Sequence, residues 1–138
     1  MSRRGAARLA LVMTLLTAAL GGVESVAAAA GSWVATAPGV RVAMATREVT
    51  SAPLVAPGGL ATERIETLTW RYRLAPGQAV RARLCHANGC LPLSGSRGSS
   101  RALAGLSGST TLHFRFALAP GQGKATTVQG LQVIVNYR

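Results

Sequence analysis

The segment Leu68-Thr69-Trp70-Arg71-Tyr72-Arg73-Leu74 decides the fold class of this chain. Apolar and polar residues alternate along its whole length, which is the period of a β-strand with one buried face. The apolar members, Leu68, Trp70, Tyr72 and Leu74, are expected to face a core, and the two arginines between them to face solvent. The segment therefore predicts a half-buried strand.

Other segments of the chain repeat this alternation. Clear strands are predicted at residues 80–84, 112–116 and 131–137, and weaker ones at 32–37, 40–49 and 65–67. After residue 31 the apolar residues do not keep a helical spacing over three turns, and residues 102–106 form the one plausible helical turn. The chain is thus predicted to be all-β.

Turn residues separate the predicted strands. Pro-Gly pairs stand at residues 38–39, 57–58, 76–77 and 120–121, and a Gly/Ser-rich stretch covers residues 94–100. Pro-Gly suits a type II turn, in which the glycine position needs a positive φ. Short strands with regular turns in about 100 residues predict one domain over residues 31–138, a small antiparallel β-sandwich or, alternatively, a small β-barrel.

The N-terminal residues 1–30 have the pattern of a secretory signal peptide. Arginines at positions 3, 4 and 8 precede an apolar run at residues 9–20, and small residues follow at 26–31. This order of a basic, an apolar and a small-residue region is typical of a cleaved leader. We expect cleavage near Ala30 and a periplasmic location. An uncleaved anchor is the alternative, although the run is short for a bilayer.

The charge of the chain is strongly positive, with a formal net charge of +11 at pH 7. After the predicted leader the acidic residues are Glu48, Glu63 and Glu66, and the basic residues are arginines apart from Lys124. Such a surface attracts anions and acidic partners, and salt screens the attraction.

The two cysteines, Cys85 and Cys90, are predicted to form a disulfide. Nearby cysteines usually pair in an oxidising compartment, and Asn88-Gly89 between them favours a tight hairpin turn. We expect the bond to fix the shape of this loop. A redox-active pair is the alternative, but such pairs usually have two intervening residues at the start of a helix.

Residues for catalysis are sparse, so we expect no enzyme. A Ser-His-Asp triad needs an aspartate, which the chain lacks. His86 and His113 have no second histidine at ligand spacing, so neither a metal nor another cofactor is predicted. A minimal hydrolase that uses one of the glutamates remains an alternative.

Arginines are predicted to gather on one face of the sheet. If the strand at residues 68–74 pairs with the next strand as a hairpin, Arg73 faces Arg81 and Arg71 faces Arg83. Like charges directly opposite one another destabilise a sheet. The four arginines therefore form a candidate partner-binding patch, which suits an acidic protein surface or lipid phosphates. A solvated outer face is the alternative.

The aromatic side chains are expected in the core. Trp33, Trp70, Phe114, Phe116 and Tyr137 alternate with polar residues, so they are predicted to pack inward. Exposed aromatics would instead favour a secreted module that binds envelope polysaccharide or anionic polymers. Nucleic acid is not expected as a partner, because inward aromatics cannot stack on bases.

Short motifs along nearly all of the chain after the leader resemble the FlhE family of flagellar proteins. The motifs are Gly31-Ser32-Trp33, Ser51-Ala52-Pro53-Leu54, Trp70-Arg71-Tyr72, Arg83-Leu84-Cys85 with Cys90, Leu93-Ser94-Gly95 and the ending Gln132-Val133-Ile134-Val135-Asn136-Tyr137-Arg138. The Trp-Arg-Tyr, Arg-Leu-Cys and terminal Val-Asn-Tyr-Arg motifs in series are fairly specific.

The resemblance implies a periplasmic β-sandwich without catalysis or a small-molecule substrate. It implies an accessory role beside the flagellar type III export apparatus, in which contact with export or rod proteins supports assembly and limits proton leak through the export gate. A chaperone-like role is also implied. Contact with an anionic membrane surface is expected from the arginine patch and not from the resemblance.

Overall fold

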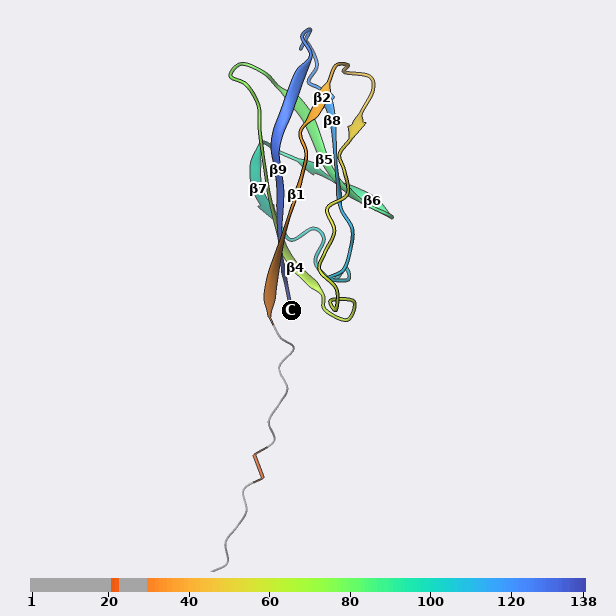
Figure 1. The fold of residues 1–138 in the computed structure, drawn as a ribbon, viewed down its shortest axis with the longest axis vertical. Coiled ribbons are helices and arrows are strands. Elements are labelled where there is room, and N and C mark those ends of the chain that lie inside the picture. Colours follow the sequence, from red (N-terminus) through yellow and green to blue (C-terminus); the bar gives the residue numbers. More distant parts are fainter. Residues whose placement is uncertain (1–20, 23–29) are drawn as a thin grey trace, which may run out of the picture.

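A computed structural model describes residues 21–22 and 30–138 of the chain (Figure 1). Apart from residues 21–22 and 30, the predicted signal peptide lies outside the described residues. The described residues form the strands β1 (Gly31–Ala37), β2 (Val40–Val42), β3 (Val49–Thr50), β4 (Ile65–Arg73), β5 (Val80–His86), β6 (Gly89–Leu93), β7 (Arg97–Ser100), β8 (His113–Leu118) and β9 (Thr126–Tyr137). In this part of the chain, no helix is long and apolar enough to cross a membrane.

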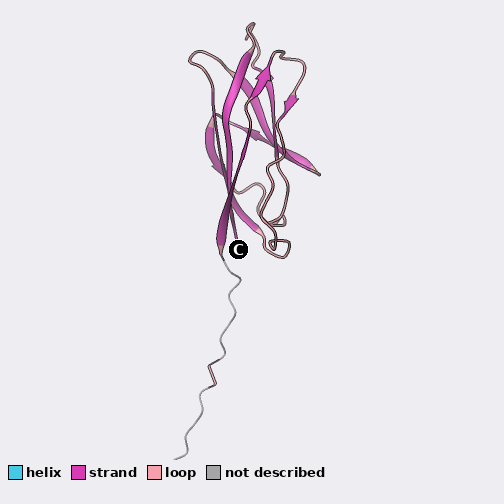
Figure 2. Cartoon of the chain, viewed as in Figure 1, coloured by secondary structure: helices cyan, strands magenta, loops and turns pink. Residues whose placement is uncertain are grey.

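The strands form two antiparallel sheets that pack face to face (Figure 2). One sheet has the order β1-β9-β4-β7, with β2 also paired to β9, and the other has the order β3-β8-β5-β6. The sheets do not close into one barrel, so the prediction of an all-β sandwich is confirmed and the barrel alternative is wrong.

The core lies between the two sheets and contains the apolar residues that the alternation places inside. Trp70 and Tyr72 of β4 are 5% and 4% exposed, and Phe114 and Phe116 of β8 are fully buried. The ring of Tyr72 meets Phe116 edge-on, with 5.2 Å between centroids. This contact joins the inner faces of the two sheets, and it confirms the prediction that these aromatics pack in the core.

Strand β9 is the longest strand and holds the five-stranded sheet together. Its first residues pair with β2, and its last seven pair with β1 on one side, while β4 pairs along the other. Gly130 divides these two stretches with a φ of 63°, a left-handed conformation that favours glycine. The pairing of β4 with β9 shifts register near this point.

The predicted hairpin between β4 and β5 is wrong. Strand β4 pairs with β9 and β7, whereas β5 pairs with β6 and β8 in the other sheet. The chain after Arg73 therefore crosses from one sheet to the other instead of turning back beside β4. The physical reason is burial: Tyr72 packs on Phe116 across the core, a contact that side-by-side pairing of β4 and β5 would not give.

Three smaller predictions are also corrected. Residues 97–100, predicted as part of a loop, form β7, and residues 40–49 divide into β2 and the start of β3. Residues 102–106 form a turn and a bend, not a helical turn. These segments are short, and their pairing partners in the folded chain decide their conformation.

Candidate functional site

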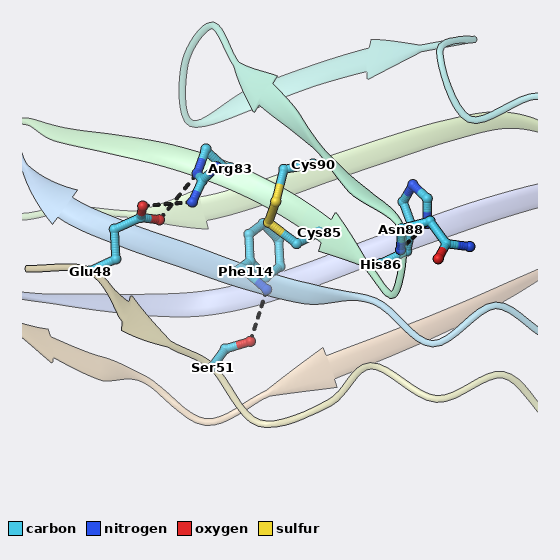
Figure 3. Close-up of a disulfide and its surroundings, with 8 residues drawn as sticks. All are labelled: Glu48, Ser51, Arg83, Cys85, His86, Asn88, Cys90 and Phe114. Carbon is cyan, nitrogen blue, oxygen red and sulfur yellow. Dashed lines mark hydrogen bonds and ion pairs between the residues drawn. A yellow bond between two sulfur atoms is a disulfide. The ribbon is translucent and has the colours of Figure 1, made fainter.

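The disulfide joins the two strands of the β5–β6 hairpin (Figure 3). Cys85 and Cys90 are directly opposite in the register, with 4.0 Å between their Cα atoms, which confirms the predicted bond. In the turn, the Asn88 backbone N–H donates a hydrogen bond to Nδ1 of His86 at 3.3 Å. The disulfide thus closes a hairpin at the edge of the four-stranded sheet, where β6 is the last strand that the described residues form.

The outer face of the four-stranded sheet carries arginines that are partly neutralised. Arg83 of β5 lies directly opposite Arg115 of β8. Glu48 accepts two hydrogen bonds from Arg83, at 2.6 Å from Nη2 and 3.1 Å from Nε (Figure 3). Arg81 donates from Nη2 to the carbonyl oxygen of Ala45 at 2.8 Å. A groove of about 370 Å³ runs along this face.

The outer face of the five-stranded sheet carries a second group of arginines. Arg71 of β4 lies directly opposite Arg97 of β7 and, on its other side, opposite Gln132 of β9. Arg73, two residues further along β4, lies over Gly130, and these arginines are exposed. Within the described residues, no carboxylate lies within 4 Å of these three guanidinium groups.

The four-arginine patch is therefore wrong as a single surface. Arg71 and Arg73 point outward from one sheet, and Arg81 and Arg83 point outward from the other, because the inner faces of β4 and β5 meet the same core. The structure replaces the predicted patch with two basic faces on opposite sides of the molecule.

Arg97 is the residue that the sequence reasoning missed. It lies in Ser94–Ser100, where serine and glycine dominate, so the segment looked like a loop. The alternation Arg97-Gly98-Ser99-Ser100 is too short and too poor in apolar residues to predict a strand. The packing of Trp70 against Gly98 gives this segment its place in the sheet.

The structure also places the residues that a hydrolase, a metal site or a sugar-binding module would need. Glu48 forms an ion pair with Arg83, and Oε1 of Glu66 lies 3.6 Å from Nη2 of Arg138. No group of three or more His, Cys, Asp or Glu side chains in the described part of the chain could hold a metal ion. Trp33 and Trp70 are buried, so they form no platform for sugars.

These features define a disulfide-linked β-sandwich with two basic outer faces. The family model described as "Flagellar protein FlhE" matches residues 39–138. The chain therefore belongs to the FlhE family of flagellar proteins, and the resemblance seen in its motifs is confirmed.

Similar proteins match this chain over most of their length. The Flagellar protein FlhE of Yersinia enterocolitica is 39% identical over 81% of this chain and 84% of the relative. The Escherichia coli K12 protein of the same name is 33% identical over 81% of this chain and 88% of the relative. A crystal structure of FlhE matches with a TM-score of 0.71 and 33% identity, over 80% of this chain and 99% of that one.

Proposed function

We propose that this protein is a periplasmic, non-enzymatic accessory protein of the flagellar type III export apparatus. In this role it contacts flagellar export or rod proteins, supports flagellar assembly and limits proton leak through the export gate. It acts by contact, as a chaperone or a plug, and uses no cofactor. Residues 1–30 serve as its signal peptide, and residues 31–138 form the β-sandwich domain that contacts its partners.

The membership of the FlhE family of flagellar proteins carries this proposal. The disulfide supports the exported location, because such bonds persist in oxidising compartments and are rare in the cytosol. Basic faces on both sides of a small sandwich offer surfaces for acidic protein partners. The buried tryptophans weigh against the alternative of a polysaccharide-binding module.

Deletion of the gene in its own flagellated host tests the proposal. The deletion strain is expected to show a defect in swimming or swarming, in flagellar number or in cytoplasmic pH, the last because protons leak inward. A plasmid copy of the full gene should restore each property. Normal motility, assembly and cytoplasmic pH together in the deletion strain would contradict the proposal.

A second plasmid copy tests whether the protein must be exported in order to function. A plasmid copy that lacks the codons for residues 3–20 removes the basic and apolar regions of the predicted leader. This copy is expected to leave the deletion phenotype unrestored, because the product stays in the cytoplasm. Full restoration by this copy would contradict the periplasmic site of action.

A further inference from the structure

We infer that the outer face of the five-stranded sheet carries a binding site for a phosphate group, formed by Arg71, Arg73 and Arg97. The phosphate could be inorganic phosphate in solution or the phosphate of a phospholipid headgroup, since both offer the same oxygens to the three guanidinium groups. The inference does not depend on the proposed flagellar role, because it rests on the geometry of this face.

The three arginines line one small hollow. Together with Tyr72 and Gly130 they line a space of about 80 Å³, and no acidic residue lines it. A hollow of this size is on the scale of a single phosphate group rather than of a protein segment. The guanidinium fork matches phosphate oxygens in pairs, which makes arginine well suited to such a group.

The arginines are held together although their charges repel. Arg71 and Arg97 are directly opposite on neighbouring strands, where like charges destabilise a sheet. A bound dianion would remove this repulsion.

Arg73 reaches over Gly130 of the neighbouring strand β9. A Cβ atom at position 130 would lie 3.2 Å from both Cζ and Nε of Arg73, so the guanidinium group lies closely over the Gly130 backbone. The left-handed φ of Gly130 keeps a glycine at this point, where the guanidinium group needs the space. The third arginine therefore lines the same hollow as Arg71 and Arg97.

The opposite face of the molecule provides an internal comparison. There, Arg83 and Arg115 are also directly opposite one another, but Glu48 binds Arg83 through two hydrogen bonds. The same arrangement of arginines thus occurs with a carboxylate on one sheet and without one on the other. The uncompensated pair is the one beside the enclosed hollow, which is why we place the anion site there.

The test measures phosphate binding by the purified protein at low ionic strength, with isothermal titration calorimetry. The wild type is expected to bind inorganic phosphate with a saturable signal. Arg71→Gln/Arg97→Gln should lose about tenfold or more in affinity, because two charge-assisted contacts are removed. Arg81→Gln/Arg115→Gln removes the same charge from the other face and should bind as the wild type does.

A second variant keeps the test decisive if the glutamine variant does not fold. Arg71→Lys/Arg97→Lys preserves both charges but removes the paired donors, so it should bind phosphate more weakly than the wild type. Thermal unfolding by circular dichroism checks that each variant is folded.

A vesicle arm separates the two sources of phosphate. Phosphatidylcholine vesicles with and without phosphatidylglycerol are sedimented with the protein, in the presence and absence of inorganic phosphate. Sedimentation that needs phosphatidylglycerol, Arg71 and Arg97 supports the lipid source, and saturable binding of inorganic phosphate alone supports the soluble source. The inference is overturned if the protein binds neither inorganic phosphate nor the phosphatidylglycerol vesicles, or if both glutamine variants lose binding equally.

Discussion

Gly98 lies against the six-membered ring of Trp70, and this contact fixes β7 in its sheet. A Cβ atom at position 98 would lie 2.2 Å from Cζ2 of Trp70. The ring cannot easily move, because it is 5% exposed and its Nε1 donates to the Gly95 carbonyl at 3.0 Å. The position therefore requires a residue without a side chain.

Gly98→Ala is expected to lower the free energy of unfolding by about 1–3 kcal/mol, the usual cost of overpacking a core. Urea denaturation monitored by tryptophan fluorescence measures the change. Gly123→Ala is the matched control: a Cβ there has no atom within 4 Å, so a change within about 0.5 kcal/mol is expected. Equal stability of the two variants would show that the contact does not hold β7.

Tyr72 makes stability depend on pH at the alkaline end. Burial raises the pKa of the Tyr72 phenol above its ordinary value. The unfolded chain therefore releases this proton first, near pH 10. The contribution of Tyr72 is fully present below about pH 10 and is lost as the pH rises through the folded-state pKa.

Tyr72→Phe should remove the decrease in unfolding free energy that ionisation of Tyr72 causes above about pH 10. Urea denaturation of both proteins is expected to give a constant difference from pH 6 to 9, and a difference that shifts in favour of the variant above about pH 10. A parallel decline of the two proteins above pH 10 would contradict the assignment to Tyr72.

At the scale of the elements, the disulfide constrains one hairpin. Cys85 and Cys90 are separated by only five positions in sequence. The closed loop is short, so the entropy that the bond removes from the unfolded chain is modest, equivalent to about 2 kcal/mol. The core cluster between the two sheets includes Leu84 of β5 and contains neither cysteine.

Cys85→Ser/Cys90→Ser is accordingly expected to stay folded and to lose about 2 kcal/mol of unfolding free energy. Reduction of the wild type should produce a similar loss in urea denaturation, and the reductant should leave the double variant unchanged. A variant that is unfolded in buffer would mean that the bond holds more of the fold than its hairpin.

The alternation of side chains predicted the strands but not their neighbours. Residues 68–73, 80–84 and 131–137 form strands because their apolar residues reach a common core, and the alternation reveals this in a single sequence. Pairing depends on contacts between distant residues, such as Trp70 opposite both Gly98 and Val133. A hairpin between β4 and β5 agreed with the alternation and with the turn residues, although it set arginines opposite one another. Burial across the core excludes it.

Sequence predicted the local features of the candidate site but not the contacts between distant residues. The disulfide lies within one hairpin, so residues 85–90 together with the predicted export were enough to predict it. The exposure of Arg71 and Arg73 followed from alternation, and the structure agrees. Arg97 could not be added from sequence, because its place beside Arg71 depends on a strand that contains no strong strand signal.

At the scale of the whole molecule, two sheets with buried aromatics leave basic surfaces on both outer faces. One face is partly neutralised by Glu48, and the other presents Arg71, Arg73 and Arg97. The two faces are therefore chemically different.

The location and redox state of the chain in its own cells test the account most directly. Cells are separated into periplasmic and cytoplasmic fractions under acid quench, and free thiols are labelled with a maleimide polymer that retards the protein on a gel. We predict a cleaved product in the periplasmic fraction that takes label only after reduction, since Cys85 and Cys90 are joined. An uncleaved product in the cytoplasm that takes two labels without reduction would contradict the account.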